Sequence, residues 1–273
     1  MSRDRLHDAL HDKVVWITGA SRGIGAALAS EFARYGARVV LSAPEAEREA
    51  LHHAKSLCQQ AGRHWIVPLD LARSDSLHAA WEQVRNVAGR VDILVHNAGI
   101  TQRARALDTA PDVDRYLMEV NYFGAVELTK IVLPHMIRHS AGGQVVVISS
   151  VLGLVATPER SAYIAAKHAL TGFFEALRTE VTEAGIGITL VFPGFVDTDM
   201  ARHALKGDGQ PYGHKDAGMT RGMTAAALAA QVIPAVAARK ERVVVAGREK
   251  ALLWLERVSP GLVSQIVRRV KLT

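Results

Sequence analysis

The sequence predicts an α/β protein built as one doubly wound domain around a seven-stranded parallel sheet. Short apolar segments alternate with amphipathic ones along most of the chain, which places helices on both faces of a parallel sheet. The first apolar segment runs directly into a glycine-rich turn. The chain has 273 residues with no internal repeat or low-complexity linker, and an α/β domain often reaches this length as a single unit.

The first half of the chain is expected to supply four strands and three helices. Short apolar runs suited to burial on both faces predict strands at Val14–Thr18, 38–42, 64–71 and 91–99. Periodic segments, the first two ending at Gly36 and Gly62, predict helices at 24–35, 45–61 and 74–88.

The second half continues the alternation. Helices are expected at 113–140, 163–184 and 224–238, and strands at 144–150, 187–194 and 242–247. Between the sixth strand and the last of these helices lies a polar, glycine-bearing segment, 198–224. Ligands of such sheets bind beyond the carboxyl ends of the strands, near the switch in strand order. The loops after strands one, four, five and six are therefore expected to carry the function.

Composition is that of an ordinary soluble protein, with 49% hydrophobic and 22% charged residues. The single cysteine, Cys58, can form no intramolecular disulfide and no cysteine-based zinc site. The charged first 13 residues lack the apolar core of a signal peptide, and no apolar run is long enough to span a membrane. We therefore expect a cytoplasmic protein.

The formal charge of +6 is concentrated at the C-terminus. Residues 239–273 hold nine Lys/Arg and three Asp/Glu, so the rest of the chain is neutral on balance. A nucleic-acid-binding surface is therefore not predicted.

Apolar residues in 251–273, interrupted at Pro260 and Gly261, predict two short amphipathic helices. Together with Arg268, Arg269 and Lys271, this extension could lie on an anionic membrane surface. The competing interpretation is packing over the substrate cleft or against another subunit.

A nucleotide site is predicted at Thr18–Gly25, TGASRGIG. Gly19, Gly23 and Gly25 let the backbone turn tightly and approach a phosphate, and the following helix offers free N–H groups to a pyrophosphate. Strand two ends Ser42-Ala43-Pro44 without an acid to bind a ribose 2′-hydroxyl. Since Arg22 can reach a 2′-phosphate, NADP(H) is favoured over NAD(H).

Two further strand ends fit this site. Asp70, followed by Leu71 at the end of the third strand, can bond an adenine amino group or cap the next turn. Asn97, Ala98 and Gly99 end the fourth strand, where small residues let a ring or ribose lie against the backbone.

A proton-transfer site is predicted at Tyr163. Lys167 lies four residues on, hence on the same helix face, and a neighbouring ammonium would lower the pKa of the phenol from about 10. Ser150 ends the fifth strand at the same rim of the sheet, whereas Ser149 should point to the other face. Asn121, inside a helix, needs hydrogen-bond partners, and a bound water leading to Lys167 is one solution.

These motifs match in order and spacing those of the short-chain dehydrogenase/reductase family, which the sequence resembles over residues 12–247. The resemblance implies a Rossmann-type domain over 1–250, with a substrate loop at 198–224. The extension at 251–273 resembles that of the dehydrogenase/reductase member-seven group. His96 and Pro44 depart from the family pattern: relatives often carry Asn at the first position, and NADP-preferring relatives Arg at the second.

The resemblance also implies roles for individual residues. Tyr163 would be the acid/base, Ser150 would orient the carbonyl, Lys167 would bind the nicotinamide ribose, and Asn121 would hold a relay water. Nucleotide contacts would extend to Ser21 and Ile24 in the glycine turn and to Pro193, Gly194, Val196 and Thr198 after the sixth strand.

The expected function is therefore NADP(H)-dependent reduction of a carbonyl, or oxidation of the matching alcohol, on a small to medium apolar substrate. A nucleotide sensor without turnover is the alternative, although such relatives usually lose the Tyr or Lys. A sugar-nucleotide epimerase or dehydratase would need a larger substrate domain. The resemblance implies a homodimer or homotetramer formed through helices around 113–140 and 163–184.

Overall fold

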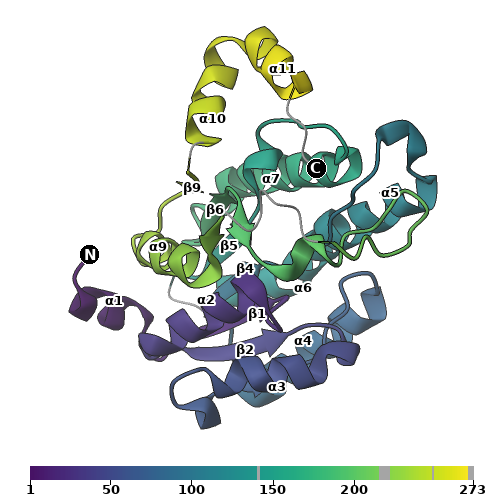
Figure 1. Ribbon diagram of the computed structural model, residues 1–273. Coiled ribbons are helices and arrows are strands. Elements are labelled where there is room, and N and C mark those ends of the chain that lie inside the picture. The colour runs from purple at the N-terminus through teal and green to yellow at the C-terminus, as the bar shows by residue number, and fades with distance from the viewer. Residues whose placement is uncertain (140–141, 215–221, 248, 270–273) are drawn as a thin grey trace.

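A computed structural model describes residues 1–139, 142–214, 222–247 and 249–269 of the chain, and it contains the expected seven-stranded parallel sheet (Figure 1). The strand order is β3-β2-β1-β4-β5-β6-β9, so the order reverses between β1 and β4. The seven strands are β1 (Val14–Thr18), β2 (Arg38–Ser42), β3 (Trp65–Ile66), β4 (Ile93–His96), β5 (Gln144–Ile148), β6 (Gly187–Pro193) and β9 (Arg242–Val245).

Helices cover both faces of the sheet, as a doubly wound fold requires. One face packs on α1 (Arg3–Leu10), α2 (Gly23–Arg34), α3 (Arg48–Ser56) and α9 (Ala225–Ala237). The other packs on α4 (Ser74–Ala88), α6 (Gly124–His139) and α7 (Ser161–Val181). Successive residues of β1 alternate between the two cores, with Val15 and Ile17 in one and Val14 and Trp16 in the other. The predicted fold class is confirmed.

Boundaries differ from prediction where the chain lies at the edge of the sheet. The helix expected over 45–61 is a 3-10 turn at Glu45–Glu47 followed by α3, and it ends at Ser56. The strand expected over 64–71 pairs in the ladder only at Trp65–Ile66. Beyond it, Val67 and Leu69 still donate backbone hydrogen bonds to Leu41 and Ala43, so the chain stays extended beside β2 up to Asp70.

The N-terminal segment, expected only as a charged stretch, forms helix α1. Leu6 and Leu10 lie four residues apart, on one face, and are both buried. This i, i+4 pair of leucines within a polar segment is the sequence pattern that indicates an amphipathic helix. The many charged residues around the pair led to the segment being interpreted only as a charged stretch.

The long helix expected over 113–140 is continuous but not uniform. It consists of α5 (Pro111–Met118), one π-helical turn at Glu119–Phe123, and α6, while Ser140 lies outside the described residues. Single π-turns inside α-helices often occur at functional sites. Here the turn contains Asn121.

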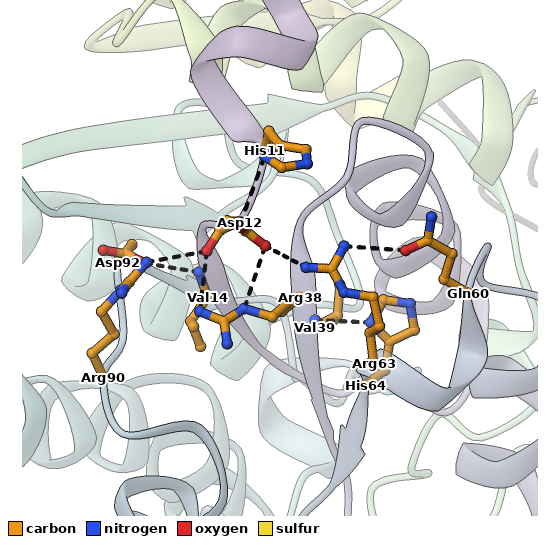
Figure 2. A network of polar contacts seen from close by, with 10 residues as sticks. All are labelled: His11, Asp12, Val14, Arg38, Val39, Gln60, Arg63, His64, Arg90 and Asp92. Atoms are coloured by element: carbon orange, nitrogen blue, oxygen red, sulfur yellow. Dashed lines mark hydrogen bonds and ion pairs between the residues drawn. The ribbon is translucent and has the colours of Figure 1, made fainter.

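Figure 2 shows the polar network at the amino ends of β1, β2 and β4. The carboxylate of Asp12, on a residue with φ of 59°, bonds Arg63 and lies 3.9 Å from Arg38. Asp92 accepts bonds from the Val14 backbone and from Arg90, at 2.8 and 2.9 Å. These charges hold the strand starts together at the edge opposite to the strand ends where a ligand would bind.

The segment 198–224 contains more structure than its weak pattern predicts. β7 (Val196–Asp197) pairs in parallel with β8 (Met223–Thr224), which closes the loop at its base. Residues 215–221, including Lys215 and Met219, lie outside the described residues.

The C-terminal extension forms the two expected helices, α10 (Glu249–Val258) and α11 (Pro260–Arg269), which stand out from the sheet body in Figure 1. Val263 and Val267 of α11 pack on Val155. Lys271 and the rest of 270–273 lie outside the described residues. Among the helices described, none is long and apolar enough to cross a membrane.

Candidate active site

A cavity of about 370 Å³ opens at the carboxyl ends of β1, β4, β5 and β6, the region expected for a ligand. Most of the sequence-predicted site residues line it, while Gly25 and Asn121 lie behind its wall. The predicted residues at its surface are Gly19, Ser21, Arg22, Gly23, Ile24, Asp70, Leu71, Asn97, Ala98, Gly99, Ser150, Tyr163, Lys167, Pro193, Gly194, Val196 and Thr198.

The glycine turn is packed too tightly for side chains. Gly19 has a φ of 64°, and a Cβ there would lie 2.7 Å from the Cα of Ala98. A Cβ on Gly25 would lie 2.1 Å from the carbonyl oxygen of Gly19. The first turn of α2 therefore starts directly behind the cavity wall, with its N–H groups available to a phosphate.

Asn97 supports this turn from behind. Its side-chain amide donates to the carbonyl oxygens of Thr18 and Gly19, both at 3.0 Å. The hydroxyl of Thr18 in turn accepts the backbone N–H groups of Asn97 and Ala98. The side-chain nitrogen of Asn97 thus joins the ends of β1 and β4 at the switch point.

Asp70 fits both of its predicted roles. One carboxylate oxygen accepts the backbone N–H of Ala72 at 3.0 Å, which caps the turn that leads to α4. The residue is half-buried and also lines the cavity. The turn-capping bond holds the carboxylate at the wall of the cavity, and the adenine contact stays a prediction.

Tyr163 and Ser150 both line the cavity, and the Ser150 hydroxyl is close enough to lower the pKa of the phenol. The hydroxyl of Ser150 also accepts the backbone N–H of Leu152 at 3.1 Å. Ser149 also lines the cavity, but its hydroxyl bonds that of Thr171 at 3.1 Å. Ser150, whose hydroxyl acts on Tyr163, stays the residue predicted to orient the substrate.

The pKa of Tyr163 differs from the sequence expectation. Burial, at 7% exposure, raises the pKa of the phenol above its ordinary value. The hydrogen bond from Ser150 and the charges of Arg160 and Arg103 act in the opposite direction. Desolvation of the buried phenol outweighs these neighbours, so the net shift of the pKa is upward. Lys167 is not among the groups that lower the pKa of Tyr163.

Lys167 is itself buried, at 3% exposure. Its ammonium lies 5.7 Å from the centre of the Tyr163 ring and donates to the carbonyl oxygen of Ile148 at 3.0 Å. Burial lowers the pKa of Lys167 to about 8. The group therefore remains mostly protonated at neutral pH, but less firmly than a surface lysine.

Asn121 is fully buried, and both of its amide atoms are used. Its oxygen accepts the backbone N–H of Ile100 at 3.0 Å, and its nitrogen donates to the carbonyl of the same residue at 2.9 Å. A Cβ on Gly99 would lie 2.5 Å from that oxygen and 3.6 Å from the Lys167 nitrogen. Asn121 and Lys167 thus meet behind Gly99, where no larger residue fits.

At the adenosine end, Arg22 is held by two side chains that the sequence did not single out as partners. Its guanidinium lies 2.9 Å from the carboxylate of Glu47 and 2.8 Å from the Nε2 of His203. The hydroxyl of Ser21 also bonds Glu47. Sequence reasoning missed Glu47, because only the 3-10 turn after Pro44 returns this acid to the cavity.

Arg160 is a second residue that sequence reasoning missed. It is buried, lines the cavity just before α7, and contributes positive charge near Tyr163. Its position three residues before the tyrosine was visible in the sequence, but nothing there indicated that the side chain turns inward.

The arrangement as a whole can bind a dinucleotide and transfer one proton. The turn and helix start at one end suit phosphates, whereas Ser150 and Tyr163 line the other end. Thr198, next to Gly23 at the turn, belongs to the loop after β6 and joins the two ends.

Comparison with known proteins agrees with this geometry. The family model described as short chain dehydrogenase matches residues 13–208. Dehydrogenase/reductase SDR family member 7B of Xenopus laevis is 39% identical over 264 residues, covering 94% of this chain and 81% of that protein.

Solved structures share the fold. A short chain dehydrogenase/reductase from Burkholderia phymatum, in complex with NAD, superposes with a TM-score of 0.81 at 23% identity, covering 93% of this chain and 95% of that one. An alcohol dehydrogenase from Thermococcus sibiricus, complexed with 5-hydroxy-NADP, superposes at 0.72 with 26% identity, covering 86% and 95% of the two chains.

Proposed function

This chain belongs to the short-chain dehydrogenase/reductase family and is an oxidoreductase acting on CH–OH or C=O groups with NAD(P), and we propose that it reduces the carbonyl of a small to medium apolar substrate with NADPH. The observation that carries the proposal is the buried Tyr163, which lies beside Ser150 at the end of a cavity that begins at the glycine turn.

Each residue of the predicted catalytic set has a separate role in the proposed carbonyl reduction. When bound, the nicotinamide cofactor supplies a hydride to the carbonyl carbon. Tyr163 donates its hydroxyl proton to the carbonyl oxygen, which Ser150 orients by hydrogen bonding. Lys167, whose ammonium lies 5.7 Å from the centre of the Tyr163 ring, binds the nicotinamide ribose. Asn121 keeps the π-turn in place behind Lys167 and holds a relay water.

The pKa of Tyr163 supports the reductive direction. Because burial raises it above its ordinary value, the phenol is protonated at neutral pH and ready to donate. Oxidation of an alcohol requires the phenolate, which becomes available only as the pH rises. We expect reduction to be favoured near pH 7 and alcohol oxidation in alkaline solution.

NADP(H) is the proposed cofactor because Arg22 lies at the surface of the adenosine end. A 2′-phosphate would replace Glu47 as the partner of Arg22 in a charge-assisted contact. Among the solved neighbours, the Thermococcus sibiricus enzyme carries an NADP derivative and the Burkholderia phymatum one carries NAD, so family membership alone leaves the choice open.

An apolar substrate is proposed from the walls around Tyr163. The side chains lining this end of the cavity are mainly apolar: Val120, Val151, Leu152, Phe195 and Met200. Pockets of this kind gain affinity from apolar contact and use a few polar groups for orientation. Here the polar groups include Ser150, Tyr163 and the buried Arg160.

The test combines nucleotide binding with turnover. Fluorescence titration of the purified protein should give tighter binding of NADPH than of NADH. Loss of absorbance at 340 nm should follow when 4-nitrobenzaldehyde or benzil is added as an apolar carbonyl probe. Tyr163→Phe should retain the NADPH affinity within about twofold and lose at least about 100-fold in kcat, the scale of general acid catalysis.

Each outcome separates the proposal from its alternative. Near-normal turnover by Tyr163→Phe would remove the tyrosine from its proposed role. Tight nucleotide binding by the wild-type protein with no reduction of either probe would favour the alternative, a nucleotide sensor without turnover. Preference for NADH would overturn the role given to Arg22.

We also propose assembly into a homodimer or homotetramer. The helices around 113–140, which family members use for this purpose, expose the large apolar side chains of Tyr116, Phe123 and Ile137. Such residues are suited to burial between subunits. The location in the cell, cytoplasmic or membrane-peripheral through the C-terminal extension, stays a prediction.

A further inference from the structure

Gln102 is a buried amide outside the residues discussed so far. It lies six residues after β4, is fully buried, and does not line the cavity. Burying a primary amide requires hydrogen bonds for both its oxygen and its nitrogen. In this chain those bonds converge on the beginning of the helix that carries Tyr163.

The oxygen of Gln102 accepts two backbone N–H groups of α7, those of Ala162 at 2.9 Å and Tyr163 at 3.2 Å. Backbone N–H groups can only donate, so the orientation of the amide is fixed. Its nitrogen donates to the hydroxyls of Thr109, at 3.1 Å, and Ser161, at 3.4 Å. The oxygen and the nitrogen of Gln102 thus make four hydrogen bonds, all of them to other groups of the protein.

This amide replaces an ordinary helix cap. The residue before α7, Arg160, makes no side-chain cap, although the first N–H groups of a helix need acceptors. Gln102 supplies the acceptor from 60 residues away in the chain. The backbone of Tyr163 is therefore held by the loop after β4 and not by its own segment.

The same loop is joined to the substrate loop. The N–H of Leu205 donates to the carbonyl of Thr101 at 2.9 Å, and the N–H of Arg103 donates to the carbonyl of Leu205 at 2.8 Å. Gln102, between these two bonds, thus connects the loop over the substrate to the tyrosine helix. None of the family motifs described for this sequence includes Gln102.

We propose that Gln102 is a positioning residue, which holds the first turn of α7 and so places the Tyr163 hydroxyl against Ser150 for proton transfer. This proposal for Gln102 rests on the proposed carbonyl reduction. Misplacing a reacting group by about 1 Å can cost about 100-fold in rate. Loss of the cap should therefore lower kcat and leave the glycine turn, which lies at the other end of the cavity, undisturbed.

Two substitutions separate positioning from general damage. Gln102→Met keeps the length of the side chain and removes the acceptor, whereas Gln102→Glu keeps the acceptor and adds a negative charge at a helix N-terminus, where it is tolerated. Gln231→Met, at an exposed position of α9, is the matched control. Thermal unfolding of each variant confirms that it is folded before assay.

With 4-nitrobenzaldehyde and NADPH, Gln102→Met should lower kcat about 10- to 100-fold, with KM and the NADPH Kd within about twofold. Gln102→Glu should recover most of kcat. Its added charge should move the alkaline limb of the kcat/KM profile for reduction to higher pH, because a nearby anion disfavours the phenolate of Tyr163.

Hydrogen–deuterium exchange of residues 160–168 supplies a readout that needs no substrate. Exchange should accelerate in Gln102→Met and return to the wild-type rate in Gln102→Glu. Wild-type kcat in Gln102→Met, or failure of Gln102→Glu to restore exchange or kcat, would overturn the proposal. If wild type itself reduced no probe, the proposed function would fail, while unchanged exchange in Gln102→Met would separately disprove the cap.

Discussion

At the adenosine end of the cavity, Arg22 lies between groups from two other segments. Glu47 follows β2 and His203 belongs to the substrate loop. A nucleotide with a 2′-phosphate must compete with the Glu47 carboxylate for Arg22, whereas a free 2′-hydroxyl could bond that carboxylate directly. We therefore expect the selectivity between NADPH and NADH to depend on the Arg22–Glu47 pair and not on the end of β2 alone.

The Arg22–Glu47 pair leads to a prediction about the affinities for NADPH and NADH. Arg22→Ala should weaken NADPH binding about 10- to 100-fold, the value of one charge-assisted contact, and change NADH binding little. Glu47→Gln should strengthen NADPH binding, because the competing carboxylate is gone. Fluorescence titration of each variant with both nucleotides measures the effect.

Arg48→Ala is the matched control for these titrations. Arg48 is half-exposed, pairs with Glu45, and does not line the cavity. Its removal should leave both affinities unchanged. An equal loss of NADPH and NADH affinity in Arg22→Ala would show that the arginine acts on the pyrophosphate or on folding, and not on the 2′-phosphate.

Several site residues were predictable one at a time. The i, i+4 spacing of Tyr163 and Lys167 is a local property of a helix, and the position of Ser150 at the end of a strand is likewise local. The sign of the Tyr163 pKa shift was not, because it is the balance of burial against charges from Arg160 and Arg103. Those groups come together only in the folded chain.

At the scale of elements, the extension α10–α11 has two different faces. Leu252, Leu253 and Leu255 lie on the inner side with Val263 and Val267, whereas Trp254, Val258, Leu262 and Ile266 are exposed. The inner face supports the interpretation of docking, because Val155 belongs to the segment that also supplies Val151 and Leu152 to the cavity.

The inner contact yields a prediction about the substrate end of the cavity. Val263→Ser should release α11, because burial of one valine is worth about 1.5 to 3 kcal/mol. The KM for 4-nitrobenzaldehyde should rise, while the Kd for NADPH stays the same. Limited proteolysis of 249–269, faster in the variant, would confirm that the helix has been released.

Ile266→Ser, on the exposed side of the same helix, provides the control. It should change neither KM nor proteolysis. It also tests the membrane interpretation of the extension: co-sedimentation of the wild-type protein with vesicles of phosphatidylserine and phosphatidylcholine, reduced by Ile266→Ser, would show that the outer face contacts lipid. No co-sedimentation of the wild type would remove that interpretation.

For the whole molecule, His96 sets a pH dependence of stability. This residue, where relatives often carry Asn, is buried in β4, and burial lowers its pKa to about 3. Thr129 donates its hydroxyl proton to Ala125, so it accepts from the Nε2–H of His96. The Nδ1 atom is buried and has no hydrogen-bond partner within the described chain. Protonation there is therefore disfavoured.

The unfolded chain binds this proton and the folded one does not. The folded pKa lies below the unfolded value, so the contribution of His96 is complete above about pH 6.5 and falls as the pH drops toward 3. Between pH 7 and pH 5 the loss is about 2 kcal/mol of unfolding free energy. Urea unfolding across this range measures it.

His96→Asn isolates the effect. The pKa values of His64 and His135 are also lowered by burial, but these residues titrate in both proteins. The variant should therefore lose less stability than wild type between pH 7 and pH 5, by about 2 kcal/mol, whatever its stability at pH 7. Equal slopes for the two proteins would show that His96 is protonated in the folded state.

Taken alone, the sequence determined the fold class, six of the seven strand positions closely, the glycine turn and the spacing of Tyr163 and Lys167. Each follows from a local rule: apolar periodicity, glycine backbone freedom, or the pitch of a helix. The same rules failed at β3, α1 and the π-turn, where edge pairing, packing on α9 or a bond to Ile100 decides the conformation.

Tertiary structure alone decided which side chains share the cavity and in what electrostatic state. Glu47 reaches Arg22, and Gln102 caps a helix 60 residues away. Burial, and not a neighbouring lysine, dominates the pKa of Tyr163. Desolvation and long-range contacts depend on what surrounds a group in three dimensions, and a linear pattern contains no measure of those surroundings.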